Sequence, residues 1–293
     1  MQLANRSALR LVVGMALLSV SILNPGAAGA QERRAGLRSS PYGISPFPSP
    51  QWWVDSTLDM ASRLPGSTPA VVWIVGEVLF PVDCGLSFPN PTPGTTYPNV
   101  VFKSSVDENE PYFDAFDQAG IKVWLQVEPG NADVGTLIGL VMQQYAHHPS
   151  VVGFGVDVEW YKNKKFRNGR AVTDAEASAW ASQVRSFNSA YLLFTKHWLE
   201  EKMPPTYRTD MVFVDDSQGF RSLDAMANEF AAWGQAFAPA PVGFQFGYAR
   251  DRKWWSKFAD PPKTLGDAIR ARVPNNSELI WVDFTAYEIW PPE

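Results

Sequence analysis

The feature that most limits the possible folds is a regular alternation of apolar, strand-like runs with helical patterns. Seven runs rich in Val, Ile, Leu and Phe follow one another, at residues 70–78, 121–128, 151–159, 191–198, 211–216, 242–248 and 279–284. Continuous apolar runs of this kind are typical of parallel strands that are buried on both faces.

The segments between the runs carry helix signals. Ile138, Val141, Met142 and Tyr145 follow the i, i+3, i+4, i+7 spacing of one helix face. The residues 173–176 (Thr-Asp-Ala-Glu) form a capping box ahead of another helix, and residues 223–237 and 264–273 are predicted to be helical as well. Strands and helices that alternate in this way favour an α/β fold of the (β/α)8 TIM-barrel type.

Two features leave the architecture partly open. Only seven strands are clear, so the barrel is expected to be irregular or incomplete if the eighth strand is short or polar. A doubly wound open sheet is the second candidate, but no glycine-rich phosphate turn follows the first run.

The chain divides into three predicted regions. Arg6 and Arg10 precede an apolar stretch at 11–23 and the small residues at 28–30, which predicts a signal peptide over residues 1–30 and a secreted or periplasmic protein. An uncleaved anchor is the alternative. Residues 31–66 are predicted to be a proline-rich linker or N-terminal arm, and residues 67–293 to be the barrel catalytic domain.

Composition excludes several classes of function. Removal of residues 1–30 takes away two arginines and no acidic residue, so the net charge of −5 becomes −7. An acidic exported chain is a poor candidate for nucleic acid, and we expect no membrane partner after signal cleavage and a monomer. One cysteine and three histidines predict no disulfide framework, no metal and no other cofactor. A G-x-S-x-G nucleophile elbow is also missing from the sequence.

Most of the predicted strands end in polar residues. Because the carboxyl ends of barrel strands meet at one mouth, where active sites lie, these residues are candidates for a common site. Loop capping is the structural alternative for any one of them. The residues concerned are Glu77, Gln126, Glu128, Asp157, Glu159, Tyr161, Lys196, His197, Asp215, Asp216, Gln245, Tyr248 and Asp283.

Asp157 and Glu159 form the most informative pair. They are two residues apart at the end of a buried run, so on a strand they would point to the same face. Burying an unpaired carboxylate is costly, and two carboxylates on one face suit acid/base chemistry on a sugar.

The closing D-x-E of the run 151–161 resembles the D-x-x-D-x-D-x-E signature of chitinase-like family 18 glycosidases. Asp157 and Glu159 match the last two acids, whereas Gly155 and Val152 stand where that motif has aspartates. The resemblance implies a barrel in which Glu159 is the general acid and Asp157 orients the substrate. By the same analogy Trp281 would floor a sugar subsite, and Asp215 and Tyr248 would support the reaction. Other secreted barrel glycosidases, including those acting on galactosaminogalactan-type polymers, fit equally.

These observations predict a glycoside hydrolase that acts on a polysaccharide or oligosaccharide. Glu159 is the expected acid, Asp157 its electrostatic partner, and Asp215 or Glu128 the nucleophile or base. The expected substrate-binding residues are Glu77, Gln126, Glu128, Tyr161, Lys196, Tyr248, Trp281 and Asp283.

Three further hypotheses accompany this prediction. One alternative is a barrel that binds carbohydrate without cleaving it, in keeping with the missing upstream acids. A metal-dependent enzyme would use Asp157, Glu159 and Asp215 as oxygen ligands. The pair Trp254 and Trp255 is either a sugar platform or part of the packing on the barrel exterior.

Overall fold

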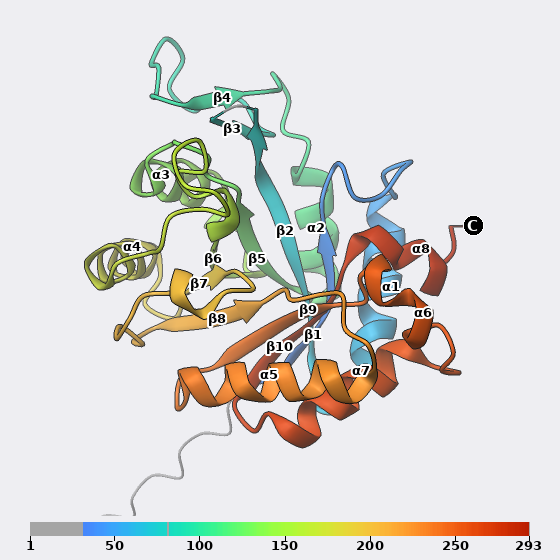
Figure 1. The fold of residues 1–293 in the computed structure, drawn as a ribbon. Helices are drawn as coiled ribbons and strands as arrows, with labels where there is room; N and C mark the ends of the chain where they lie inside the picture. The colour runs from blue at the N-terminus through green and yellow to red at the C-terminus, as the bar shows by residue number, and fades with distance from the viewer. Residues whose placement is uncertain (1–31, 81, 293) are drawn as a thin grey trace, which may run out of the picture. The chain divides into compact units, whose positions relative to one another are not determined.

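Eight parallel strands close into a ring, in the order β1, β2, β5, β6, β7, β8, β9, β10 and back to β1 (Figure 1). The computed structural model describes residues 32–80 and 82–292. The predicted signal peptide therefore lies outside the described residues. The closed ring confirms the predicted (β/α)8 barrel.

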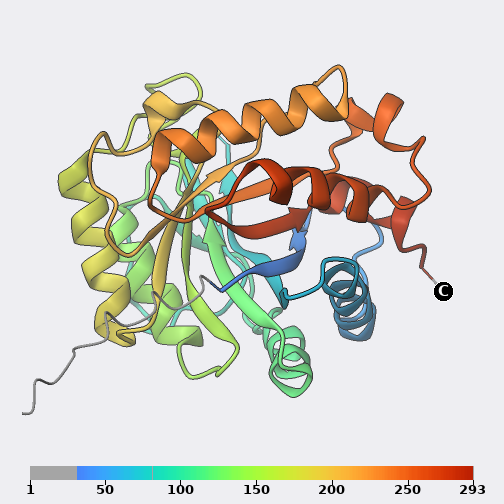
Figure 2. The ribbon, with the colours of Figure 1, turned by 90° about the horizontal axis from the view of Figure 1, so that it is seen from below.

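The barrel strands agree with the seven predicted runs and add one more. Their bounds are β1 Arg34–Ser39, β2 Thr68–Leu79, β5 Lys122–Val127, β6 Val151–Asp157, β7 Leu192–Lys196, β8 Met211–Asp215, β9 Val242–Phe246 and β10 Asn276–Trp281. Helices lie outside the ring, as the view from below also shows (Figure 2). They are α1 Pro50–Ser62, α2 Glu110–Ala119, α3 Val134–Tyr145, α4 Asp174–Phe187, α5 Leu223–Phe237, α6 Arg252–Trp255, α7 Pro261–Arg272 and α8 Ala286–Ile289.

The eighth strand is β1, and it corrects the predicted linker over residues 31–66. β1 pairs with both β10 and β2 and so closes the ring, and α1 follows it as the first barrel helix. Arg34 and Arg38 lie on the face of β1 that points into the barrel and make that face polar. The buried Ala35 and Leu37 lie on the opposite face. Gly36 is required between them, since a Cβ there would lie 1.7 Å from the Ala70 carbonyl oxygen.

A short extension projects beyond the ring on one side. β3 Asp83–Leu86 pairs antiparallel with the end of β2, and β4 Val100–Phe102 pairs with β3 (Figure 1). The proline-rich segment 88–94 lies in the connection between these two strands.

The core has two layers, as a barrel requires. The larger layer fills the space between strands and helices, and a smaller cluster fills the barrel interior. The interior cluster consists of Val72, Trp124, Phe194, Val212, Val214 and Ile280. Every second residue of these strands therefore faces the barrel axis. The same alternation determines which side chains at the strand ends point into the mouth of the barrel.

The structure confirms one local prediction from the sequence. Thr173 and Glu176 form the complete capping box at the start of α4. Within residues 32–80 and 82–292, no helix has both the length and the apolar character needed to cross a bilayer.

The interior of β6 leaves no room for a side chain at Gly155. A Cβ there would lie 2.0 Å from the Phe194 ring. We predict that Gly155→Ala lowers the free energy of unfolding by about 1–3 kcal/mol, because overpacking forces neighbours off their rotamers. Urea unfolding monitored by tryptophan fluorescence measures this.

Gly139→Ala is the matched control. In α3 the nearest atom to a Cβ at Gly139 is 3.7 Å away, so this change should stabilise by about 0.5–1 kcal/mol through helix propensity. Equal effects of the two substitutions would contradict the interior packing described for Gly155.

Candidate active site

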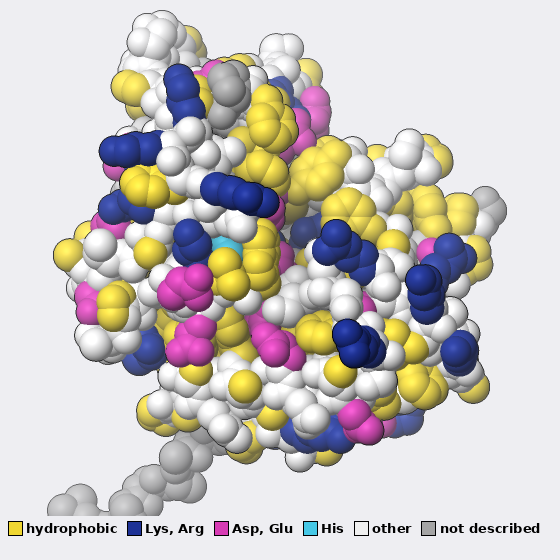
Figure 3. Space-filling view, in the orientation of Figure 1, with side chains coloured by type: hydrophobic (Ala, Val, Ile, Leu, Met, Phe, Trp, Pro, Cys, Tyr) yellow, Lys and Arg dark blue, Asp and Glu magenta, His cyan; other side chains and the backbone are white. Residues whose placement is uncertain are grey.

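Charged side chains gather where four neighbouring strands end. Four of these side chains continue the inward-facing rows of β5, β6, β7 and β8, and each is at most 5% exposed. In strand order they are Glu128, Asp157, Lys196 and Asp216. In the space-filling view, hydrophobic and basic side chains border a recessed centre in which acidic side chains show (Figure 3).

Lys196 joins two of these carboxylates. Its Nζ lies 2.8 Å from Asp157 Oδ2 and 2.5 Å from Asp216 Oδ2. Burial alone would lower the pKa of Lys196, but Asp157 and Asp216 outweigh it and hold that pKa well above the usual range. The ammonium is therefore the partner of Asp157, one of the three acids that the metal hypothesis gave to an ion.

Asp157 positions Glu159 through the backbone. β6 ends at Asp157, and Glu159 lies in a short 3-10 helix, Val158–Trp160, so the predicted shared strand face is wrong. Asp157 Oδ1 instead accepts a hydrogen bond of 3.3 Å from the Glu159 backbone N–H. Burial raises the pKa of Asp157, while Lys196 opposes that rise.

Glu159 is the one acid of this group with a free carboxyl. It is half-buried, and among the described residues its carboxyl oxygens have no hydrogen-bond or ion-pair partner. Burial, followed by the charge of Asp157, raises the pKa of Glu159 to about 7. A carboxyl that exchanges its proton near neutral pH and is not engaged by protein is suited to acid/base catalysis.

Glu128 is a second acid with a shifted pKa, and it is more enclosed. Its Oε2 accepts a hydrogen bond of 2.9 Å from the Val78 N–H, and its Oε1 accepts one from the Tyr42 hydroxyl. Burial and the charge of Asp157 raise the pKa of Glu128 to about 7, although both hydrogen bonds lower it.

The opposite side of the mouth holds a second cation. Arg38, near the end of β1, donates two hydrogen bonds of 3.0 and 2.6 Å to Asp283 Oδ1, and Ser40 donates to Oδ2. Burial raises the pKa of Tyr248, as does Asp216, whereas Arg38 lowers it. Arg38, Tyr248 and Asp283 thus complete the ring of polar groups around the mouth.

The structure places several predicted site residues in this group. Glu159, Asp157, Glu128, Lys196, Tyr248 and Asp283 belong to it by the hydrogen bonds, ion pairs and charge interactions described above. Gln126 lies deeper in the barrel, and its two side-chain polar atoms are buried without a hydrogen-bond partner in the described part of the chain. Gln245 is in the same situation.

Other predicted residues point elsewhere. The Asp215 carboxylate accepts from the Ser217 N–H at 2.7 Å and interacts with Glu229 of α5, so it faces the helices. Tyr161 donates to Glu176 at 2.7 Å and packs against Trp180. These two positions correct the roles predicted for Asp215 and Tyr161.

Glu77 and Trp281 also lie away from the mouth group. Glu77 pairs with Lys103 beside the β3–β4 extension. Trp281 is fully buried on the outer face of β10, where its Nε1–H donates to Thr285 Oγ1 at 3.0 Å. A ring held in that way is part of the core and does not form the floor of a sugar subsite.

The remaining aromatic and histidine candidates have structural contacts. Trp255 is 2% exposed and Trp254 donates to the Phe220 carbonyl at 3.0 Å, so this pair belongs to the packing. His197 is fully buried, with Nε2 3.0 Å from the Asn168 carbonyl and Nδ1 accepting from the Leu199 N–H. Burial lowers the pKa of His197 to about 4.

Sequence reasoning counted Asp216 among the strand-end candidates but gave the catalytic role to Asp215, and it did not consider Arg38 and Tyr42 as site residues. Strand alternation was the available signal for Asp216. Val212, Val214 and Asp216 alternate along β8 and point into the barrel, whereas Phe213 and Asp215 point outward. Arg38 and Tyr42 fell within the predicted linker, so no strand-end argument reached them.

No family model matches the chain, and neither does any curated protein. Among solved structures, one similar chain is assigned as an α-L-fucosidase from Bacteroides thetaiotaomicron, with 13% identity, TM-score 0.40, and coverage of 93% of this chain and 79% of that one. An FMN-binding β-glucuronidase from Faecalibacterium prausnitzii has 12% identity, TM-score 0.48, and coverage of 88% and 38%.

A third similar chain is assigned as a lyase/mutase from Burkholderia cenocepacia, with 13% identity, TM-score 0.45, and coverage of 88% and 80%. The chain thus resembles glycosidases and at least one protein of another class. All three TM-scores are below 0.5, so these likenesses carry no argument about chemistry.

The ion-pair geometry predicts a large cost for removing Lys196. Lys196→Met leaves Asp157 and Asp216 buried and uncompensated, which should lower the free energy of unfolding by about 3–5 kcal/mol at pH 7. Lys263→Met is the control, because Lys263 pairs with Asp267 at 2.6 Å on an exposed helix face and should cost at most about 0.5 kcal/mol. Similar losses in urea unfolding would refute the buried arrangement.

The raised pKa of Glu159 predicts a pH-dependent stability. The folded protein keeps a proton that the unfolded chain loses above about pH 4.3, so this contribution is present at low pH and is lost as pH rises through 7. Glu159→Gln should therefore exceed wild type in stability by about 1–2 kcal/mol at pH 8, with a smaller difference at pH 5. A difference that is the same at both pH values in urea unfolding would rule out the shift.

Proposed function

We propose that this chain is a glycoside hydrolase with Glu159 as the general acid. The observation that carries the proposal is the unpartnered, half-buried Glu159 carboxyl, whose pKa is raised to about 7, at the mouth of a (β/α)8 barrel. Near neutral pH a sizeable fraction of such a group is protonated and ready to give its proton to a glycosidic oxygen.

A partner carboxylate is needed for the second half of the reaction. Glu128 suits that role better than Asp215, because Glu128 directly follows the neighbouring strand β5 and its charge acts on Glu159. In the proposed step, Glu159 protonates the leaving oxygen as the bond to the anomeric carbon breaks. Glu128 either adds to that carbon, after which water deprotonated by Glu159 hydrolyses the glycosyl–Glu128 bond, or it deprotonates the water that attacks the carbon directly.

Asp157 and Lys196 have supporting roles in this proposal. Asp157 fixes the turn that carries Glu159, and its charge helps to keep that carboxyl protonated. Lys196 in turn holds Asp157 at 2.8 Å. Neither residue has to exchange a proton with the substrate.

Exposed aromatic rings beside the mouth support a sugar substrate. Tyr42 is 52% exposed and Phe284 is 45% exposed, with ring centroids 6.3 Å apart. Such rings offer apolar faces against which the C–H faces of a sugar pack, while their polar neighbours satisfy its hydroxyls. Together with the predicted signal peptide, these exposed rings favour a polysaccharide or oligosaccharide substrate outside the cell or in the periplasm.

The N-acetyl substrate typical of chitinase-like family 18 enzymes receives less support. At Gly155, where that motif has an aspartate, the Phe194 ring fills the space of a side chain. We therefore propose a glycosidase without assigning it to that family.

A carbohydrate-binding barrel without catalysis is the second candidate. The Tyr42 hydroxyl covers Glu128, and Lys196 neutralises Asp157, which would suit binding alone. Only turnover separates the two functions.

The test replaces the acid and keeps its shape. Glu159→Gln should reduce release of reducing ends from a panel of polysaccharides by about 10²–10⁴-fold, since it removes general acid catalysis, while affinity for the cleaved polysaccharide stays within a few fold. Asp215→Asn is the control, because its carboxyl faces the helices and its pKa is raised well above the ordinary value by burial.

Turnover by Glu159→Gln at the wild-type rate would remove Glu159 from the mechanism. Binding of a polysaccharide by the wild-type protein with no product from any bound ligand would favour the non-catalytic barrel.

A further inference from the structure

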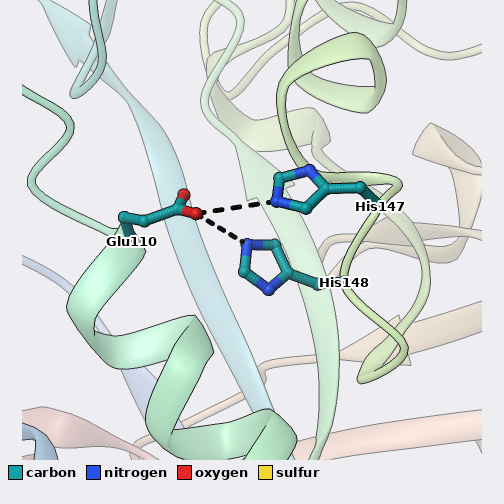
Figure 4. A group of neighbouring side chains, drawn as sticks. All are labelled: Glu110, His147 and His148. Carbon is teal, nitrogen blue, oxygen red and sulfur yellow. Dashed lines mark ion pairs between the residues drawn. The ribbon is translucent and has the colours of Figure 1, made fainter.

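Outside the barrel mouth, two histidines and a glutamate point toward one another. Glu110 is the first residue of α2, and His147 and His148 lie in the turn between α3 and β6. The Glu110 carboxylate faces both imidazole rings (Figure 4). Among the described residues this is the one group of three His, Cys, Asp or Glu side chains close enough to share an ion.

The spacing of the three ligand atoms fits a small cation. Glu110 Oε1 lies 3.6 Å from His147 Nε2 and 3.5 Å from His148 Nε2, and all three atoms are within 4.8 Å of one another. Ligands about 2.0–2.1 Å from Zn²⁺ at tetrahedral angles are separated by about 3.4 Å. The side chains therefore need little movement to bind one ion.

His148 provides a second observation that points to a ligand site. It is 3% exposed, and its Nε2 is buried without a hydrogen-bond partner among the described residues. An imidazole nitrogen rarely remains buried and unsatisfied, because its desolvation is not repaid. This nitrogen points at the group that the other two side chains complete.

The other nitrogen of His148 is arranged as in metal sites. Its Nδ1 lies 2.7 Å from Asp117 Oδ2, and Asp117 Oδ1 accepts a hydrogen bond of 2.9 Å from the Ser150 N–H. A proton held on Nδ1 by this carboxylate leaves the lone pair of Nε2 free for coordination. A carboxylate behind the ligating histidine is the usual outer partner of a zinc-bound imidazole.

We propose that Glu110, His147 and His148 bind a divalent transition-metal ion, with Zn²⁺ as the preferred ion. Two imidazoles and one carboxylate suit Zn²⁺, whereas Mg²⁺ and Ca²⁺ prefer oxygen ligands throughout. The exposed His147 leaves a fourth position for water. The ion would tie the start of α2 to the turn before β6, so the site is structural and separate from the residues of the mouth.

The test measures Zn²⁺ binding directly. The full-length chain without an affinity tag is freed of metal with a chelator and titrated with ZnCl₂ in a calorimeter at pH 7.5. We expect one equivalent to bind, a rise in the unfolding temperature, and no comparable effect of MgCl₂. Co²⁺ in place of Zn²⁺ should give the visible ligand-field bands of a four-coordinate site.

Variants assign the ligands. Glu110→Gln and His147→Ala, both at accessible positions, should each weaken Zn²⁺ binding at least about tenfold. Glu108→Gln is the matched control, because it removes the same charge two residues away on an exposed side chain and should bind Zn²⁺ like wild type. Circular dichroism verifies that each variant is folded.

Two outcomes would overturn the proposal. One is that wild type binds no stoichiometric Zn²⁺, which would leave the group as ordinary ion pairs between histidines and a glutamate. The other is that the Glu110→Gln, His147→Ala double variant binds Zn²⁺ with unchanged affinity. Neither result bears on the role of Glu159, because no residue is shared between the two sites.

Discussion

The contact on which the mouth of the barrel depends is the buried Lys196 ammonium between Asp157 and Asp216. It joins the ends of β6, β7 and β8 in one network with distances of 2.8 and 2.5 Å. Without it two carboxylates would be buried unpaired, which is far more costly than burying a satisfied pair. Burial, and after it the charge of Asp157, raises the pKa of both Glu128 and Glu159 to about 7.

This balance links packing to chemistry. Lys196 holds Asp157, Asp157 caps the turn at Val158–Trp160, and that turn presents Glu159 with an unengaged carboxyl. The pKa of Glu159 therefore depends first on the burial of its carboxyl and then on the charges at the neighbouring strand ends. The buried ion pair thus contributes to the proposed acid by holding the residue that positions its turn.

The strands, the barrel and half of the mouth were predictable because they depend on periodicity. Apolar runs identify β2 and β5 to β10, and strand ends converge in any barrel of this type. β1 was missed because its interior face carries Arg34 and Arg38 and therefore lacks an apolar run. Asp215 was preferred to Asp216 because one residue of register decides the face, and the end of an apolar run does not define that register. The role predicted for Trp281 in a sugar subsite was wrong for the same reason.

The central claim is that Glu159 holds its proton near neutral pH. A ¹³C NMR titration of protein labelled at the glutamate carboxyls measures this directly, with the Glu159 signal assigned from its loss in Glu159→Gln. The account predicts a midpoint for Glu159 near pH 7. A midpoint near pH 4.3, the value of an unperturbed glutamate, would contradict it.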